Sequence, residues 1–216
     1  YVPVTLGHKY LGVPVAPQQT KFALWAPTAR DVSLCLYDDG DGPAHSLQQL
    51  RRDAQTGAWS AVVDRDFSGD YYTYLVDVQV DGVGLVRNRV TDPYAVSLTT
   101  DSRRGYVANL QSPRLKPADW DRTQSPQSVQ AATDAVIYEL HVRDFSIGDA
   151  SVQPAYRGKY LAFTLADTDG MRQLQALAAA GITDVHLLPV FDFGSVPELG
   201  CVTPSPVGTR DGETQQ

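Results

Sequence analysis

The sequence AVIYELHV, at residues 135–142, determines the fold that we predict for the second half of the chain. Its side chains fall into two alternating sets, with Val136, Tyr138, Leu140 and Val142 on one face and Ile137, Glu139 and His141 on the other. Alternation with a period of two residues indicates a β-strand. A second apolar stretch, ITDVHLLPV at residues 182–190, is too short for a helix and predicts another strand.

The residues between these two stretches predict a helix. Thr168 or Asp169 provides an N-cap, Gly181 provides a stop, and apolar residues recur between them at helical spacing, namely Met171, Leu174, Leu177 and Ala178. A strand, a helix and a strand in this order form a βαβ unit, whose two strands lie parallel.

The first strand carries polar residues where a covered parallel strand is usually apolar on both faces. Glu139 and His141 share one face, and Arg143 and Asp144 follow directly. Two interpretations stay open. The strand either faces a polar cleft or barrel mouth, or it is an edge strand with one solvent-exposed face. His186, within the second stretch, has the pattern of a core histidine.

The first half of the chain contains several short strands separated by turn residues. Residues 22–26, 32–36, 58–63, 71–80 and 83–90 alternate in the strand pattern, and Asp81-Gly82 is a hairpin signal. Strands of this length and spacing predict an antiparallel sandwich. Cys35 falls within one of them and is expected to be a buried thiol.

Composition narrows the classes of partner. The chain has 216 residues with a formal net charge of −7, which argues against nucleic acid or an anionic membrane as a partner. No stretch approaches the roughly 18 apolar residues of a membrane span, and no basic, apolar leader opens the given sequence. We expect a soluble protein with an uncharged ligand, and the compartment is not predicted.

At this point the motifs resemble a known family. VIYELHVRDFS (136–146) and GITDVHLLPVFDF (181–193) look like the first two barrel strands of the alpha-amylase superfamily of glycoside hydrolases, in its pullulanase-type debranching branch. FALWAPTARDVSLCLY (22–37) resembles the start of a carbohydrate-binding module of family 48. The fold that this resemblance implies is multidomain, with an immunoglobulin-like antiparallel β-sandwich followed by the first βαβ unit of an incomplete (β/α)8 TIM barrel.

The resemblance also implies a division of the chain. Residues 1–17 form an extended lead-in, 18–110 the sandwich, 111–132 a linker, 133–193 the start of the barrel, and 194–216 a disordered tail or truncated insertion. The two parallel strands would leave an open edge and an uncovered apolar face. The barrel portion is therefore expected to be poorly stable unless it packs on something else.

The implied activity is hydrolysis of α-1,6-glucosidic bonds in starch, glycogen, pullulan and limit dextrins. The family's catalytic carboxylates lie on later barrel strands, so we assign no catalytic residue and expect this chain alone to be inactive. One alternative is a non-catalytic α-glucan-binding or adaptor protein. Another is a different member of the superfamily, such as a branching enzyme.

Candidate site residues follow from both lines of argument. His141, Asp144 and Asp192 are candidates for binding substrate or supporting the site. The alternative is a buried hydrogen-bonded or ionic cluster that supports the site from behind, which we favour for Glu139 and Arg143. Trp25, Trp59, Tyr71 and Trp120 are the aromatic residues considered for stacking on sugar rings, and Trp59 and Trp120 are the two chosen. The alternative for each is packing in the core or an interface. In the resemblance, relatives that bind glycogen carry a tryptophan just after the hairpin turn, where this chain has Val83, Gly84 and Leu85. This departure argues against sugar binding by the sandwich and favours a structural role for it as a partner of the barrel.

No cofactor or metal site is predicted. The turn DDGDGP at residues 38–43 lacks the spaced oxygen ligands and closing glutamate of an EF-hand. The resemblance allows a structural calcium ion in a complete enzyme, without support from these residues.

Overall fold

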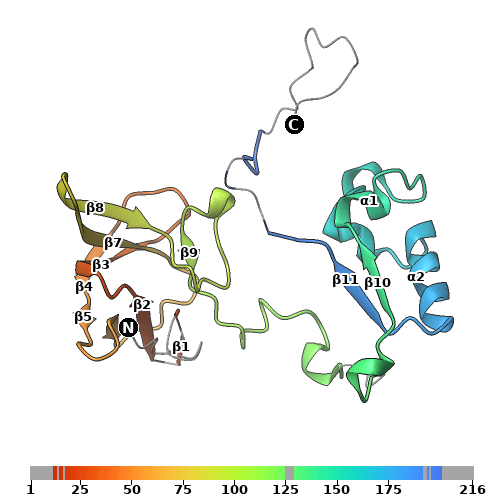
Figure 1. Cartoon of the computed structure of the whole chain (residues 1–216), viewed down its shortest axis with the longest axis horizontal. Coiled ribbons are helices and arrows are strands. Elements are labelled where there is room, and N and C mark those ends of the chain that lie inside the picture. Colours follow the sequence, from red (N-terminus) through yellow and green to blue (C-terminus); the bar gives the residue numbers. More distant parts are fainter. Residues whose placement is uncertain are drawn as a thin grey trace, which may run out of the picture. The chain divides into compact units, whose positions relative to one another are not determined.

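The computed structural model describes residues 12–13, 15–16, 18–124, 129–191, 194 and 196–200. The chain divides into two compact units, one formed by Tyr1–Trp120 with Pro197–Gln216 and the other by Asp121–Val196 (Figure 1). Each unit is described by itself.

The first unit is built on two antiparallel sheets. One has the strand order β1-β2-β6-β5, with β1 (Val15–Ala16), β2 (Gln19–Trp25), β6 (Ala58–Val63) and β5 (Arg51–Arg52). The other has the order β4-β3-β7-β8, with β4 (Ser46–Gln49), β3 (Ala29–Tyr37), β7 (Tyr71–Val80) and β8 (Gly84–Val90). A short strand, β9 (Gly105–Tyr106), pairs with the beginning of β7. The predicted antiparallel β-sandwich is confirmed.

The core of the sandwich consists of the inward-facing side chains of these strands. The alternation read from the sequence is confirmed on β3 and β7, whose inner residues are Val32, Leu34, Leu36, Tyr72 and Tyr74. Phe22 joins them from β2 and meets the ring of Tyr72 edge to face, with ring centroids 5.5 Å apart. On the opposite face of β3, Cys35 is a buried free thiol, as expected.

The hairpin between β7 and β8 turns at Asp81-Gly82, as predicted. Gly82 has a φ of +75°, a conformation that only glycine adopts at little cost. Val83 and Leu85 follow the turn and are exposed.

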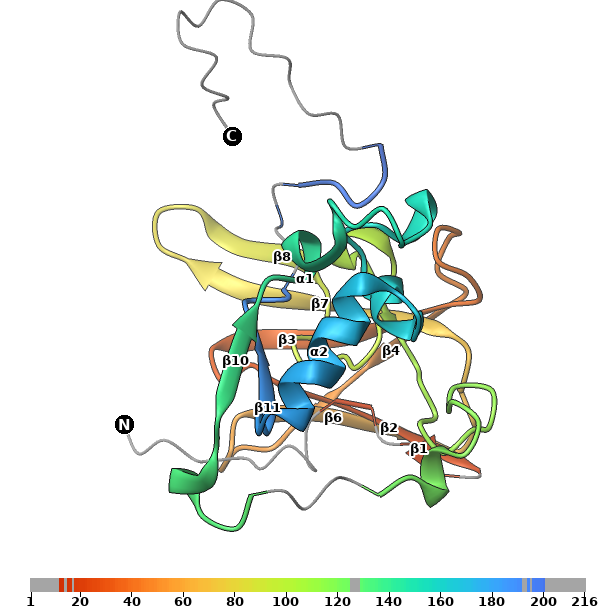
Figure 2. The same cartoon turned by 90° about the vertical axis from the view of Figure 1, so that its right-hand side faces the viewer.

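The second unit contains two parallel strands and a helix. β10 (Ile137–Leu140) and β11 (Asp184–Leu187) pair in parallel, and α2 (Asp169–Ala179) lies along them in both views (Figures 1 and 2). α2 ends at Ala179, and Gly181, the predicted stop, follows the C-cap residue Ala180 with a φ of +107°. There the amides of Gly181 and Ile182 donate to the carbonyls of Ala178 and Leu177, which is the Schellman arrangement.

Both strands of the second unit are shorter than their sequence pattern predicts. β10 stops at Leu140 because a short helix, α1 (Val142–Ser146), begins there with His141 as its N-cap. His141 and Val142 therefore do not extend the strand, which corrects the prediction for residues 135–142. β11 ends at Leu187, two residues before Pro189, which has no N–H group for a sheet hydrogen bond. A two-stranded parallel sheet is not a barrel, so the barrel assignment stays a prediction.

Five short 3-10 segments complete the described elements: Thr100–Ser102, Trp120–Arg122, Ala132–Asp134, Pro154–Tyr156 and Tyr160–Thr164. In the part of the chain that the structure describes, none of the helices has the length and apolar character needed to cross a membrane.

Candidate functional site

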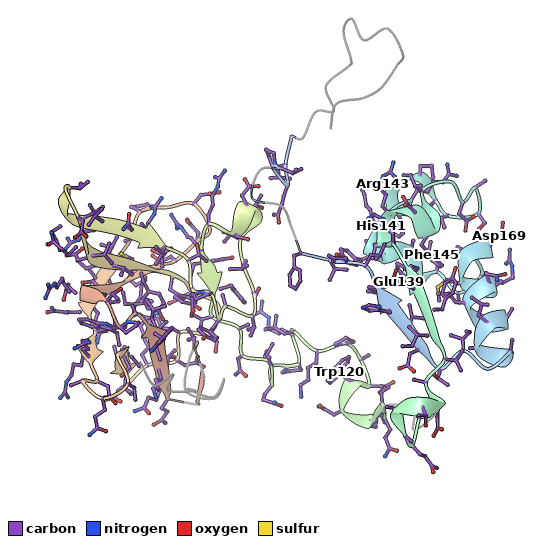
Figure 3. All side chains as sticks on the ribbon, viewed as in Figure 1. Trp120, Glu139, His141, Arg143, Phe145 and Asp169 are labelled. Atoms are coloured by element: carbon purple, nitrogen blue, oxygen red, sulfur yellow. The ribbon has the colours of Figure 1, made fainter. Side chains whose placement is uncertain are left out.

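The polar residues that the sequence singles out gather at the carboxyl ends of β10 and β11. We call Glu139, His141, Arg143, Asp144 and His186 the strand-end cluster. Glu139, His141 and Arg143 lie along the end of β10 and the start of α1 (Figure 3). His186 joins them from β11, because the parallel register places it opposite Glu139.

Glu139 and His186 form one half of the strand-end cluster. The Nδ1 atom of His186 lies 3.1 Å from Oε2 of Glu139, and more than half of each side chain is exposed to solvent. A pair in this position is screened by water and contributes little to stability. In the chain as described, His186 is exposed and paired with Glu139, so it is not a core histidine here.

His141 and Asp144 form the other half, and the structure brings these two predicted candidates together. The backbone N–H of Asp144 donates to Nδ1 of His141 at 3.4 Å, so the histidine side chain caps α1. The guanidinium of Arg143 donates to the Asp144 carboxylate at 2.9 Å. The cluster is hydrogen-bonded and ionic, as the alternative interpretation has it, but its side chains are exposed and not buried. Asp192, the third candidate, lies outside the described residues.

This geometry limits what the strand-end cluster does chemically. Here the carboxylates of Glu139 and Asp144 face a histidine and an arginine and stay in contact with water. The arrangement suits local positioning of the strand ends and polar contact with a ligand, and it provides no isolated nucleophile.

Two features that hold α1 in place were not predicted from the sequence. The rings of Phe145 and Phe163 stack, with centroids 4.3 Å apart and planes 8° from parallel. The buried hydroxyl of Ser146 accepts the backbone N–H of Gly158 at 2.9 Å. Both contacts depend on loop residues with no periodicity.

The N-terminus of α2 is capped by a loop distant in sequence. Thr168 is the N-cap residue, as predicted, but its hydroxyl donates to the carbonyl of Leu165 and does not cap the helix. The amides of Asp169 and Gly170 donate instead to Ser151 Oγ at 2.8 Å and to Asp149 Oδ2 at 3.0 Å. The hydrogen bond from the Ser151 hydroxyl, followed by that from the Gly170 amide, lowers the pKa of Asp149.

The aromatic candidates divide by exposure. Trp59 is only 5% exposed, packs in the sandwich core and donates its indole N–H to the carbonyl of Ala26 at 2.9 Å. A buried ring presents no open face to a pyranose, so Trp59 is a packing residue and its selection as a stacking candidate is corrected. Trp120 is 61% exposed in a short 3-10 segment (Figure 3) and keeps an open face. Trp25 is partly exposed, with its indole N–H bound to the carbonyl of Thr56.

In the acidic turn at residues 38–43, oxygen atoms of Asp39 and Gly42 accept hydrogen bonds from other groups of the protein. The carboxylate of Asp39 accepts the backbone amides of Gly42 and Asp41, and these bonds lower its pKa. The guanidinium of Arg104 donates to the carbonyls of Asp39 and Gly42. Within the described ranges, no group of three His, Cys, Asp or Glu side chains is arranged to hold a metal ion.

Comparison with known families and sequences gives a consistent result. Residues 5–95 match the family described as carbohydrate-binding module 48 (isoamylase N-terminal domain). The chain is 40% identical over 191 residues to the chloroplastic pullulanase 1 of Arabidopsis thaliana, covering 87% of this chain and 20% of that protein. It is 38% identical over 192 residues to a pullulanase of Klebsiella pneumoniae, covering 87% of this chain and 18% of the relative.

Comparison with solved structures agrees. A Klebsiella pneumoniae pullulanase complexed with maltotriose matches with a TM-score of 0.80 and 35% identity, over 90% of this chain and 18% of that one. A Paenibacillus barengoltzii pullulanase in complex with maltohexaose and alpha-cyclodextrin matches with a TM-score of 0.71 and 36% identity, over 85% of this chain and 27% of that one. The chain thus spans about a fifth of the length of the curated relatives just named. The resemblance inferred from the sequence motifs is confirmed.

Proposed function

We propose that this chain, which resembles the N-terminal region of pullulanases and contains a carbohydrate-binding module 48 domain, forms part of a glycoside hydrolase. The enzyme would cleave α-1,6-glucosidic bonds in pullulan and starch-type glucans. The observation that carries the proposal is the similarity to pullulanases over 87% of the chain. That similarity runs from the sandwich through both strands of the βαβ unit, and so exceeds the match to the binding module alone.

In this proposal, the second unit is the first βαβ unit of a (β/α)8 barrel. The parallel pairing of β10 and β11 supports this assignment, because strands of such barrels are parallel. The side chains of β11 are exposed, including Val185 and Leu187, as expected of a strand that needs further neighbours to cover it. The strand-end cluster then lies at the end of the strands where barrel enzymes place their sites.

The chemistry of the whole enzyme would be retaining hydrolysis. It requires one carboxylate as nucleophile and a second as general acid and base, about 5 Å apart. The carboxylates of the strand-end cluster are each paired with a cationic or imidazole group, so we assign neither role to them. His141 and Asp144, with Asp192, are proposed to support the site or contact substrate at its rim.

The ligand class is an α-glucan. Pullulanases similar to this chain have been solved with maltotriose and with maltohexaose, which supports the same class of ligand here. Trp120 is the stacking candidate whose ring is exposed. A protein that binds glucan through such a ring without cleaving it is the second candidate function.

The test is to sequence the source gene past Gln216 and to assay the encoded protein on pullulan. We expect an extended chain to release reducing ends from pullulan at its α-1,6 bonds, while the 216-residue chain releases none. An extended chain that transfers glucan branches without net hydrolysis would indicate a branching enzyme. Binding of amylopectin without any hydrolysis, lost in Trp120→Ala, would favour the adaptor.

A further inference from the structure

The sandwich unit contains a cavity at the end of β7 opposite the Asp81-Gly82 hairpin. Its volume is about 820 Å³, within the size range of small-molecule sites. The lining combines aromatic, hydroxyl and charged side chains from the first unit, among them Tyr71, Tyr106, Ser97, Thr100, Asp101 and Arg103. We call it the Tyr71–Tyr106 pocket.

Aromatic side chains line one part of the pocket. Tyr37, Tyr71 and Tyr106 lie in register on neighbouring strands β3, β7 and β9 and therefore on one face of the sheet. The rings of Tyr71 and Tyr106 are 5.2 Å apart and tilted by 59° to one another. Tyr37 is buried, because the guanidinium of Arg104 lies 3.7 Å from its ring centre. The rings of Tyr71 and Tyr106 are the two of this row that line the cavity.

Arg104 fixes two walls of the pocket at once. Its backbone belongs to the loop of residues 97–104, in which the amide of Thr99 donates to the carbonyl of Arg104 and the amide of Ser102 donates to the carbonyl of Thr99. Its side chain reaches the turn of residues 38–43 and donates to the carbonyls of Asp39 and Gly42 at 2.8 and 2.6 Å. The pocket is therefore held in shape before any ligand arrives, which reduces the entropy lost on binding.

The rim of the pocket carries backbone strain. Asp101 and Ser102 adopt φ values of 56° and 53°, in the left-handed region that side chains other than glycine rarely occupy. Strain of this kind persists only where the surroundings impose it, and it is common at binding sites. Here Asp101 and Glu198 impose it by exchanging two hydrogen bonds, from the amide of Asp101 to the Glu198 carboxylate at 3.0 Å and from the amide of Glu198 to the Asp101 carboxylate at 2.8 Å.

The lining selects a neutral, polyhydroxylated ligand. Aromatic faces suit the C–H surface of a pyranose, while hydroxyl and charged groups around them bind its hydroxyls. The charged side chains of the lining are Asp41, Asp101 and Arg103, so two carboxylates face one guanidinium. This balance disfavours an anionic ligand such as a phosphate ester.

We propose that the Tyr71–Tyr106 pocket binds a segment of α-glucan, with the two tyrosine rings as its stacking surface. This inference rests on the proposed function for the class of sugar, and adds a binding site that is lined by residues of the sandwich unit. The pocket supplies aromatic side chains to a unit whose hairpin is followed by the exposed aliphatic residues Val83 and Leu85.

The experiment is a calorimetric titration of the 216-residue chain with maltohexaose. We expect Tyr71→Ala and Tyr106→Ala each to weaken binding by about tenfold, the loss expected for one aromatic contact. Thr100→Trp should weaken binding without removing any core contact, because Thr100 is exposed and lines the cavity that the new indole would fill. Tyr160→Ala is the matched control, since it removes an exposed tyrosine from the other unit and should leave the affinity unchanged.

The outcomes separate this proposal from the proposed function. Wild-type chain that does not bind maltohexaose, or that binds it equally well after Tyr106→Ala and Thr100→Trp, overturns the pocket proposal. If either of these results is found and an extended chain still hydrolyses pullulan, the pocket proposal fails while the hydrolase assignment stands. Maltohexaose binding that depends on Tyr71 and Tyr106 supports the pocket even if the extended chain hydrolyses nothing.

Discussion

The two units of this chain bury their hydrophobic residues to very different extents. In the sandwich, Phe22, Val32, Leu34 and Tyr74 are fully buried between two sheets. In the βαβ unit, α2 has no buried residue, and every residue of β11 is exposed. Ile137 on β10 is 61% exposed although it belongs to a parallel strand.

The difference shows which part of the chain is self-sufficient. Burial of apolar area is the main favourable term in folding, so a unit that closes its own core is stable by itself. A parallel pair with one helix leaves apolar side chains in water and an unpaired sheet edge. The βαβ unit therefore depends on further packing that the sandwich does not need.

Amide hydrogen exchange on the full chain is the most sensitive measure of this contrast. We expect the amides of β3 and β7 to exchange at least about a thousandfold more slowly than those of β10 and β11, because central sandwich strands open only on global unfolding. Mass spectrometry of peptic fragments, read at matched times, resolves the two units. Equal protection of β7 and β11 would contradict the contrast.

Removal of one core ring should affect the sandwich far more than an equivalent change affects the βαβ unit. Phe22→Ala deletes a fully buried ring that contacts Phe67 and Tyr72, and should cost about 3–5 kcal/mol of unfolding free energy. Leu174→Ala, on the half-buried face of α2, is the matched control and should cost less than about 1 kcal/mol. Urea titrations followed by circular dichroism measure both. Similar midpoints for the two variants would show that the sandwich core is not the main source of stability.

The same contrast explains what could be predicted from the sequence. The sandwich strands were identified because β3 and β7 are long enough, at 9 and 10 residues, to show alternation. The hairpin at Asp81-Gly82 and the helix stop at Gly181 were identified because each depends on a glycine with positive φ. Alternation also places Trp59 on the same inward face of β6 as Ala61, and following that pattern would have removed it from the stacking candidates.

What the sequence did not reveal depends on contacts between distant residues. β9 has only two residues, too few for a period, and its position follows from pairing with Tyr71 and Tyr72. Arg104 contacts a turn more than 60 residues earlier in the chain. Within the strand-end cluster, His141 and Asp144 were predicted from adjacency, whereas the pairing of Glu139 with His186 required the strand register.

Arg104 tests whether one long-range side chain holds the sandwich loops together. Arg104→Ala removes two hydrogen bonds to carbonyls and the stacking on Tyr37, and should cost about 3 kcal/mol of unfolding free energy. Arg103→Ala, the neighbouring exposed arginine with a surface ion pair to Asp101, should cost less than about 1 kcal/mol. Tryptophan fluorescence during urea unfolding follows both, and an equal cost would mean that the Arg104 contacts do not anchor the turn.

The smallest expected effect is a pH dependence with opposite signs in the two units. Burial raises the pKa of Asp92 in the sandwich, so its contribution to stability is full at low pH and is lost as the pH rises through the folded pKa. In the βαβ unit, the hydrogen bonds from Ser151 and Gly170 lower the pKa of Asp149. Its contribution is therefore full above about pH 4, the usual carboxyl pKa, and is lost as the pH falls through the lower folded value.

Asp149→Asn makes this difference measurable. The asparagine side chain cannot change its charge and cannot accept the same set of hydrogen bonds. The backbone amides of α2 should therefore exchange faster at neutral pH, and their exchange rate should no longer increase when the pH is lowered. Asp167→Asn removes the same charge two residues before α2 and serves as the control. Exchange of α2 measured between about pH 3 and 6, after correction for the intrinsic rate, separates the cases. If the acid-dependent opening of α2 persists in Asp149→Asn and disappears in Asp167→Asn, the effect belongs to Asp167 and the prediction is wrong. Loss of the effect in Asp149→Asn alone would show that a loop residue 20 positions before the start of α2 sets the stability of that helix.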